Sequence, residues 1–143
     1  MPAPLRIPDS ARQRLKVMLL AKHATRDGRG DASDGNHAIY HHELRATLED
    51  IGLNVIAADS FDAVSGRPDV DFVIPLLNRA GFVHSEMLAP LQLTRHRVPY
   101  PGATPIIRGL TDNKHLTKLV ARARGVATAE WKFYRRDDGV VSP

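Results

Sequence analysis

The chain has 143 residues, among them 20 lysines and arginines, 16 acidic residues and no cysteine. This length fits one domain with its own core, and the lack of cysteine excludes disulfides, thiolate metal sites and a cysteine nucleophile. No apolar run approaches the roughly 18 residues that span a bilayer, and the start of the chain has no apolar signal core. We therefore expect a cytoplasmic protein without a membrane partner.

The net charge of +4 and the isoelectric point near 9.8 raise the question of nucleic-acid binding. The basic residues are scattered among the acidic ones, and few aromatic residues are present to stack on bases. The densest basic group is Arg122, Arg124, Arg135 and Arg136. We favour a solvated face over a nucleic-acid site, and an anionic cofactor such as a nucleoside triphosphate would satisfy the same excess of positive charge.

The first part of the chain indicates a strand followed by a helix. Residues 1–15 mix prolines with charges and are predicted to form an extension that ends in a short helix. Residues 16–22, KVMLLAK, form an apolar run bounded by charges, which is typical of a strand buried in a parallel sheet. The polar residues 23–35 then form a loop at the carboxyl end of that strand, where open α/β sheets bind their ligands.

Residues 36–51 have helical periodicity, with a predicted buried stripe of Tyr40, Leu44, Leu48 and Ile51. Strands are predicted over 54–58 and 71–77, on either side of a polar segment. Because Pro75 removes a ladder donor, we expect the far end of the 71–77 strand at a sheet edge or a bend. A second loop at a carboxyl end follows over 78–84.

The next helix can be capped by Ser85, although Pro90 favours a start nearer Met87 or a bend. A short extended piece over 97–99 follows it. The alternation of strands and helices predicts an α/β fold, an open parallel sheet with helices on both faces.

The most informative stretch is 98–131, VPYPGATPIIRGLTDNKHLTKLVARARGVATAEW. It contains a Pro-Tyr-Pro-Gly turn, a helix start at Thr104 and Pro105, and a basic helix closed by Gly125. The spacing of Leu116, Leu119, Val120 and Ala123 predicts a buried stripe on this helix, and Asp112 is the favoured N-cap. Lys114 lies in the first helical turn, where the macrodipole disfavours a cation unless an anion is near.

These parts, in this order, resemble the junction between the first and central domains of D-alanine–D-alanine ligases and their ATP-grasp relatives. The resemblance covers residues 16 to about 131, and the residues that carry it are 98–102, Asn113-Lys114, 116–118, Gly125-Val126 and Trp131. It implies a pre-ATP-grasp α/β domain over 16–103. Residues 104–143 would then be the linking helices and first hairpin of a truncated central domain.

The resemblance also implies a set of site residues. Lys114 matches the lysine that reaches toward the ATP phosphates, with Asn113 in place of the usual aspartate. The family's glutamate-valine-serine motif is replaced here by Asn36-His37-Ala38, which puts D-alanine specificity in doubt. The family has a conserved-pattern loop after its third strand. In this chain only the position of that loop, which starts at Asn78, and one carboxylate, Glu86, match it. Asn36, His37, Asn78 and Glu86 are therefore the candidate substrate-binding residues, beside the helix-start interpretation of Glu86.

In function, the resemblance implies the substrate-side domain of an ATP-dependent carboxylate–amine ligase, with an amino acid or peptide as substrate and ATP and magnesium as cofactors of the full-length enzyme. The chain alone carries no expected catalytic residue, should be inactive and should bind neither cofactor tightly. A free-standing flavodoxin-like module that binds a partner or nucleotide is the alternative. The brief terminal hairpin cannot bury its own face, which leaves assembly into a homo-oligomer open.

A group of histidines, His23, His37, His41 and His42, raises a metal site as a further alternative, because His37 and His41 are four residues apart on one helical face. Asp27, Asp31 and Asp34 could contribute carboxylates, but the rest of a ligand set is not identifiable. We expect surface or loop histidines and no metal site.

Overall fold

The computed structural model describes residues 6–30, 32–78, 85–135 and 139–141. Its main body is a three-stranded parallel sheet in the order β2-β1-β3. The strands are β1 (Lys16–Leu20), β2 (Asn54–Ala58) and β3 (Phe72–Pro75). β1 lies in the centre, with Val17 paired with Val55 on one side and with Phe72 on the other.

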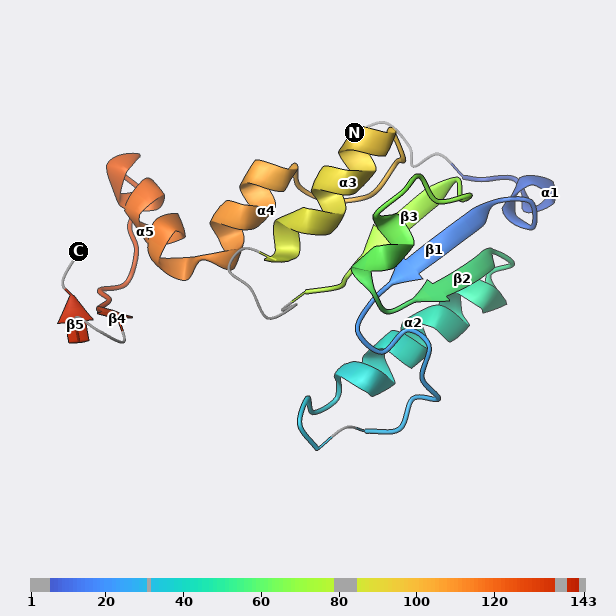
Figure 1. Ribbon diagram of the computed structural model, residues 1–143, viewed down its shortest axis with the longest axis horizontal. Coiled ribbons are helices and arrows are strands. Elements are labelled where there is room, and N and C mark those ends of the chain that lie inside the picture. Colours follow the sequence, from blue (N-terminus) through green and yellow to red (C-terminus); the bar gives the residue numbers. More distant parts are fainter. Residues whose placement is uncertain (1–5, 31, 79–84, 136–138, 142–143) are drawn as a thin grey trace.

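Helices cover both faces of this sheet, as the alternation of elements predicts (Figure 1). One face packs against α2 (His37–Asp50). The other face packs against a 3-10 turn, η1 (Phe61–Val64), and α3 (Leu88–His96). The α/β class with an open parallel sheet is therefore confirmed.

Alternating residues of β1 divide the core between the two faces. Met18 and Leu20 belong to the cluster that contains Val64 and Leu93, whereas Leu19 belongs to the cluster on the α2 side, which contains Leu44. Both Leu19 and Leu20 are fully buried. A strand buried on both faces reads as a continuous apolar run, which is why the KVMLLAK segment identifies the central strand.

Several predicted boundaries shift by a few residues. β1 ends at Leu20, although the amide of Ala21 continues the ladder to the Ala58 carbonyl at 2.9 Å. The segment between β2 and β3 contains η1, whose start is capped by the Ser60 hydroxyl. Pro75 is the last residue of β3, which lies at the edge of the sheet, as expected for a proline.

The elements around β3 also largely follow the sequence. A 3-10 turn, η2 (Ser85–Met87), precedes α3, which begins at Leu88, close to the expected start near Met87. The predicted extended piece over 97–99 is wrong at Arg97, which has a left-handed φ of +55° and ends α3. Beyond it, the Pro99 carbonyl accepts a hydrogen bond from the Val73 amide at 3.0 Å. The predicted loop over 78–84 lies, apart from Asn78, outside the described residues.

The remaining helices extend away from the sheet. A short α1 (Asp9–Arg12) precedes β1, as predicted, while α4 (Pro105–Asp112) and α5 (Lys114–Ala123) follow α3. α4 lies beside α3, and α5 lies beyond it, far from the sheet (Figure 1). The chain then forms a hairpin of β4 (Phe133–Arg135) and β5 (Gly139–Val141), with its predicted turn at Asp138 outside the described residues.

The predicted stripe on α2 is only partly right, and the one on α5 is wrong. On α2, Leu44 packs against the core cluster of Leu19, but Tyr40 and Ile51 are about half exposed, and the buried residues are Ala38 and His41. A histidine therefore lies on the buried side of this helix beside Leu44. On α5, no residue is buried, and Leu116 and Val120 are 39% and 45% exposed, because this helix does not reach the sheet.

The predicted cap of α5 is wrong by one residue. Asp112 ends α4, and the Asn113 side chain accepts a hydrogen bond from the Leu116 amide at 3.1 Å. An asparagine caps a helix start as well as an aspartate does. α5 therefore begins at Lys114 itself.

Candidate functional site

The carboxyl ends of β1 and β3 form the edge of the sheet where a ligand site is expected. β1 connects through α2 to β2 on one side, while β3 lies on the other side of β1. The chain thus leaves these neighbouring strands in opposite directions, which opens a crevice at the carboxyl edge of an α/β sheet. Two polar groups of residues lie at this edge.

The first group follows β1 and contains a buried histidine. The His23 side chain is fully buried, and its Nε2 lies 2.8 Å from Oδ2 of Asp34. The Lys22 ammonium lies 3.0 Å from the same carboxylate oxygen. The hydrogen bonds from His23 and Lys22 lower the pKa of Asp34 below its ordinary value.

His41 of α2 completes this group. Its ring lies 5.9 Å from that of His23 and 6.1 Å from that of His37, and it is only 5% exposed. Burial, followed by the nearby His23 and His37, lowers the pKa of His41 below its ordinary value. The expectation of surface histidines is therefore wrong for His23 and His41. As arranged in the described residues, no three histidine or carboxylate side chains could hold a metal ion.

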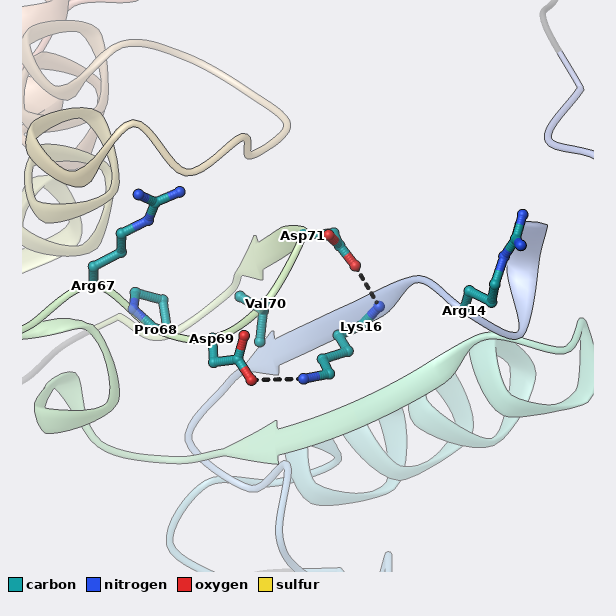
Figure 2. Close-up of a pocket in the computed structure, with 7 residues that line it drawn as sticks. All are labelled: Arg14, Lys16, Arg67, Pro68, Asp69, Val70 and Asp71. Atoms are coloured by element: carbon teal, nitrogen blue, oxygen red, sulfur yellow. Dashed lines mark hydrogen bonds and ion pairs between the residues drawn. The ribbon is translucent and has the colours of Figure 1, made fainter.

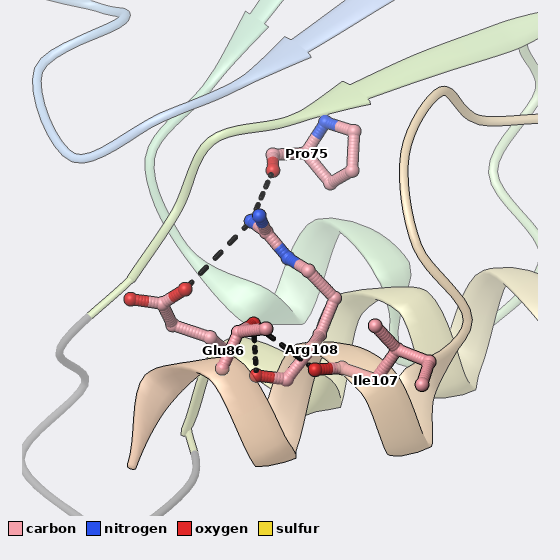
Figure 3. A network of polar contacts seen from close by, with 5 residues as sticks. Pro75, Glu86, Ile107 and Arg108 are labelled. Carbon is pink, nitrogen blue, oxygen red and sulfur yellow. Dashed lines mark hydrogen bonds and ion pairs between the residues drawn. The ribbon is translucent and has the colours of Figure 1, made fainter. Parts of the chain in front are cut away.

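The second group lies at the end of β3 and centres on Arg108 of α4. Figure 3 shows the Arg108 guanidinium extending from the helix toward the strand. Its Nη2 lies 3.5 Å from the Pro75 carbonyl oxygen and 3.9 Å from Oε2 of Glu86, both at the long end of polar contact. The guanidinium is about one-third exposed. It is held in place but keeps donors with which it can take a carboxylate from a ligand.

The predicted substrate residues divide between these two groups. Asn36 and His37 are exposed at the start of α2, beside the His23 group. Asn78 follows β3, and Glu86 lies in η2, beside Arg108. Sequence reasoning missed Arg108, although it is the only charged side chain in the first turn and a half of α4.

Lys114 lies apart from this edge, at the start of α5 (Figure 1). Its side chain is exposed, and within the described part of the chain it makes no hydrogen bond or ion pair. Lys118, one turn further along, differs: its ammonium donates to the Ala129 carbonyl at 3.0 Å and lies 5.2 Å from the centre of the Trp131 ring. Only Lys114 of these two lysines is therefore available for an anion.

Trp131, one of the residues that carry the family resemblance, fastens the segment after α5 to that helix. Its indole N–H donates to Nδ1 of His115 at 2.9 Å, and the Arg122 guanidinium lies 4.6 Å from its ring centre. Cation–π contacts of this kind contribute about 0.5–1 kcal/mol each at exposed sites. The 124–132 segment thus runs back along the polar side of α5 and leaves the apolar side open.

A pocket of about 590 Å³ lies at the opposite, amino edge of the sheet (Figure 2). In it, the Lys16 ammonium contacts Asp69 at 2.6 Å, and the Lys16 amide donates to Asp71 at 2.9 Å. The hydrogen bond with Asp69 raises the pKa of Lys16 and lowers that of Asp69. These contacts join the start of β1 to the residues before β3, so their role is structural.

No protein-family model matches this chain, and no curated protein does so either. None of the helices in the described ranges has the length and apolar character needed to cross a membrane.

Asp34 gives a test of the first polar group. Its native pKa is depressed, so its charge stabilises the fold above the ordinary aspartate value and this contribution is lost as pH falls through the native pKa. We expect Asp34→Asn to lower the urea midpoint at pH 7 and to approach the wild type as the pH falls below the ordinary aspartate value. The exposed Asp27, which pairs with Arg29 at the surface, is the control, and Asp27→Asn should change little at neutral or acidic pH. An Asp34→Asn loss that is equal at neutral and acidic pH would show that its charge is not what stabilises the loop.

Proposed function

We propose that this chain is the substrate-side domain, with the start of the central domain, of an ATP-dependent carboxylate–amine ligase similar to D-alanine–D-alanine ligases. The observation that carries this proposal is Lys114: it is the first residue of α5, it follows a capping asparagine, and it is exposed and unpaired among the described residues. A cation at a helix start is unfavourable without an anion nearby. The triphosphate of ATP is such an anion, and phosphoryl transfer depends on cations placed around it.

The parallel sheet supports the same proposal, because it supplies a ligand edge at the carboxyl ends of β1 and β3. We assign the amino-acid or peptide substrate to this edge. Arg108 would bind its carboxylate, with Glu86 3.9 Å from its guanidinium and Asn78 three residues after the end of β3. An arginine suits this role because its planar donors match a carboxylate bidentately.

The apolar side of α5 is a further support. Leu116 and Val120 are well exposed although α5 is strongly amphipathic in sequence, as is Ile107 of α4 at 46%. In the proposed ligase, the body of the central domain would cover these residues. The chain contains only the first elements of that domain, so we propose that it binds ATP and magnesium weakly and is not catalytic alone.

The strand order β2-β1-β3 is also that of a flavodoxin-like sheet, and this observation keeps a free-standing binding module as the second candidate. The two differ in their ATP chemistry. A flavodoxin-like module would need no α5 lysine and no ATP-consuming partner domain.

The first test is the ATPase activity of the purified 143-residue chain. We expect no phosphate release above buffer with ATP, magnesium and a panel of amino acids and dipeptides, because the charge-neutralising groups of phosphoryl transfer are incomplete. The preparation must be free of contaminating ligase, which a mock purification from the same host controls. Phosphate release that depends on an amino acid and follows this chain through purification would overturn the inactive assignment.

A further inference from the structure

The segment 22–30, which leaves the carboxyl end of β1, is fastened to α2 around two buried imidazoles. The Arg45 guanidinium donates to the Ala24 carbonyl at 2.9 Å, and Gly28 lies directly against the ring of His42. Oδ2 of Asp34 lies 2.8 Å from Nε2 of His23 and 3.0 Å from the Lys22 ammonium. This segment therefore lies over the start of α2 through polar contacts rather than through a large apolar core.

The two imidazoles at the centre of these contacts are buried without full hydrogen bonding. His23 is fully buried and His41 is 5% exposed, and within the described chain the Nδ1 atoms of both have no hydrogen-bond partner. A buried polar nitrogen without a partner is unfavourable, and a buried charge without a partner is far more so. Among the described residues no carboxylate contacts His41 directly, whereas Asp34 contacts His23. A proton on His41 would therefore place a charge in a buried position without a described ion-pair partner.

The rings nearest to His41 are His37 and Tyr40 on α2 and His23 on the 22–34 side. His23 and His37 disfavour a charge on His41, whereas Asp34 favours it and is the only carboxylate among these described neighbours. The Asp34 carboxylate already contacts both His23 and Lys22, so it can do little to stabilise a further positive charge on His41.

We propose that the His23–Asp34–His41 cluster is a pH-sensitive latch: protonation of His41 releases segment 22–30 from α2 and uncovers the carboxyl edge of β1. Release hydrates the His41 ring and separates it from His23. The closed form prevails at neutral pH, where His41 is uncharged.

The direction of the effect follows from linkage. Burial lowers the pKa of His41 in the closed form, whereas in the released form it returns toward the ordinary value of about 6.5. Acidification below that value therefore favours release. The open-to-closed ratio rises about tenfold for each pH unit until the closed form itself takes up the proton.

Hydrogen–deuterium exchange of the 143-residue chain at pH 7.5 and 5.5, corrected for intrinsic exchange rates, tests this latch. We expect the opening equilibrium of amides in 22–30 to rise at pH 5.5, by at most about tenfold, while amides of α3 stay unchanged. In His41→Gln the rise should disappear, because a neutral side chain then occupies the position at both pH values. His96→Gln on α3, where Nε2 of His96 lies 3.3 Å from the Ser65 carbonyl oxygen, is the control and should behave as wild type.

A rise of the same size in His41→Gln, no rise in the wild type, or an equal rise throughout the chain would each overturn the latch. If His41→Gln does not fold, the imidazole proton resonance of His41 in the wild type decides instead. Its titration midpoint must coincide with the midpoint of the exchange change in 22–30, and separate midpoints would contradict the proposal.

Discussion

Replacing Gly28 by alanine should lower the free energy of unfolding by about 2 kcal/mol or more. Gly28 has a φ of +79°, a left-handed conformation that costs a residue with a Cβ about 1–2 kcal/mol. The new Cβ would also lie 2.6 Å from Cγ of His42. That atom lies near the backbone of α2 and cannot swing away freely, so overpacking adds about 1–3 kcal/mol. Urea unfolding followed by circular dichroism measures the loss.

Gly35 provides a matched control for this substitution. It also has a left-handed φ, +61°, but a Cβ there meets no atom within 4 Å. Gly35→Ala should therefore cost only the backbone strain, and the difference between the two variants isolates the contact with His42. Equal losses in the two variants would mean that segment 22–30 does not pack against α2 as described.

Lys114→Ala should lower kcat/KM for ATP at least tenfold in the proposed full-length ligase, which corresponds to about 1.4 kcal/mol. The reason is that its exposed ammonium, at the first residue of α5, would act as a point charge near the phosphates. Steady-state kinetics with ATP as the varied substrate measures the loss. The KM of the amino-acid substrate should change much less.

Two lysines of the same region serve as controls. Lys132→Ala removes another exposed lysine and should leave ATP kinetics unchanged. Lys118→Ala should have a smaller effect than Lys114→Ala and act through stability, because Lys118 contacts Ala129 and Trp131. If Lys114→Ala matched Lys132→Ala in ATP kinetics, the assignment of Lys114 to the phosphates would be wrong.

The sheet was predictable because its strands are distinct in sequence. The segment 16–22, which contains the central strand, is apolar on both faces. Gly52, Pro75 and Pro105 lie where helices or strands end or begin. When strands alternate with helices, the connections between parallel strands are right-handed, so few arrangements of three strands are possible. The same pattern predicts the two carboxyl-end loops, whereas Asn36, His37, Asn78 and Glu86 are implied by the family resemblance and stay predictions.

The site contacts were less predictable, because they depend on how helices rotate against the sheet. Periodicity predicted that Tyr40 would be buried, but Ala38 and His41 are the buried residues of α2. His41 lies beside the His23 ring, and Arg45 of the same helix donates to the Ala24 carbonyl, and neither contact can be read from periodicity. Periodicity also predicted burial on α5, and no tertiary partner covers that face in the described structure. Arg108 was missed because its neighbours, Pro75 and Glu86, are distant in sequence.

The most direct test of the central claim is amino-acid-dependent ADP formation by the longest polypeptide encoded in the reading frame that contains these 143 residues. With ATP, magnesium and a panel of amino acids and dipeptides, the account predicts ADP and a new amide product in equal amounts, detected by coupled assay and mass spectrometry. It also predicts that Lys114→Ala lowers this rate at least tenfold. A folded polypeptide that forms neither ADP nor amide with any member of the panel would contradict the ligase assignment and favour a binding module.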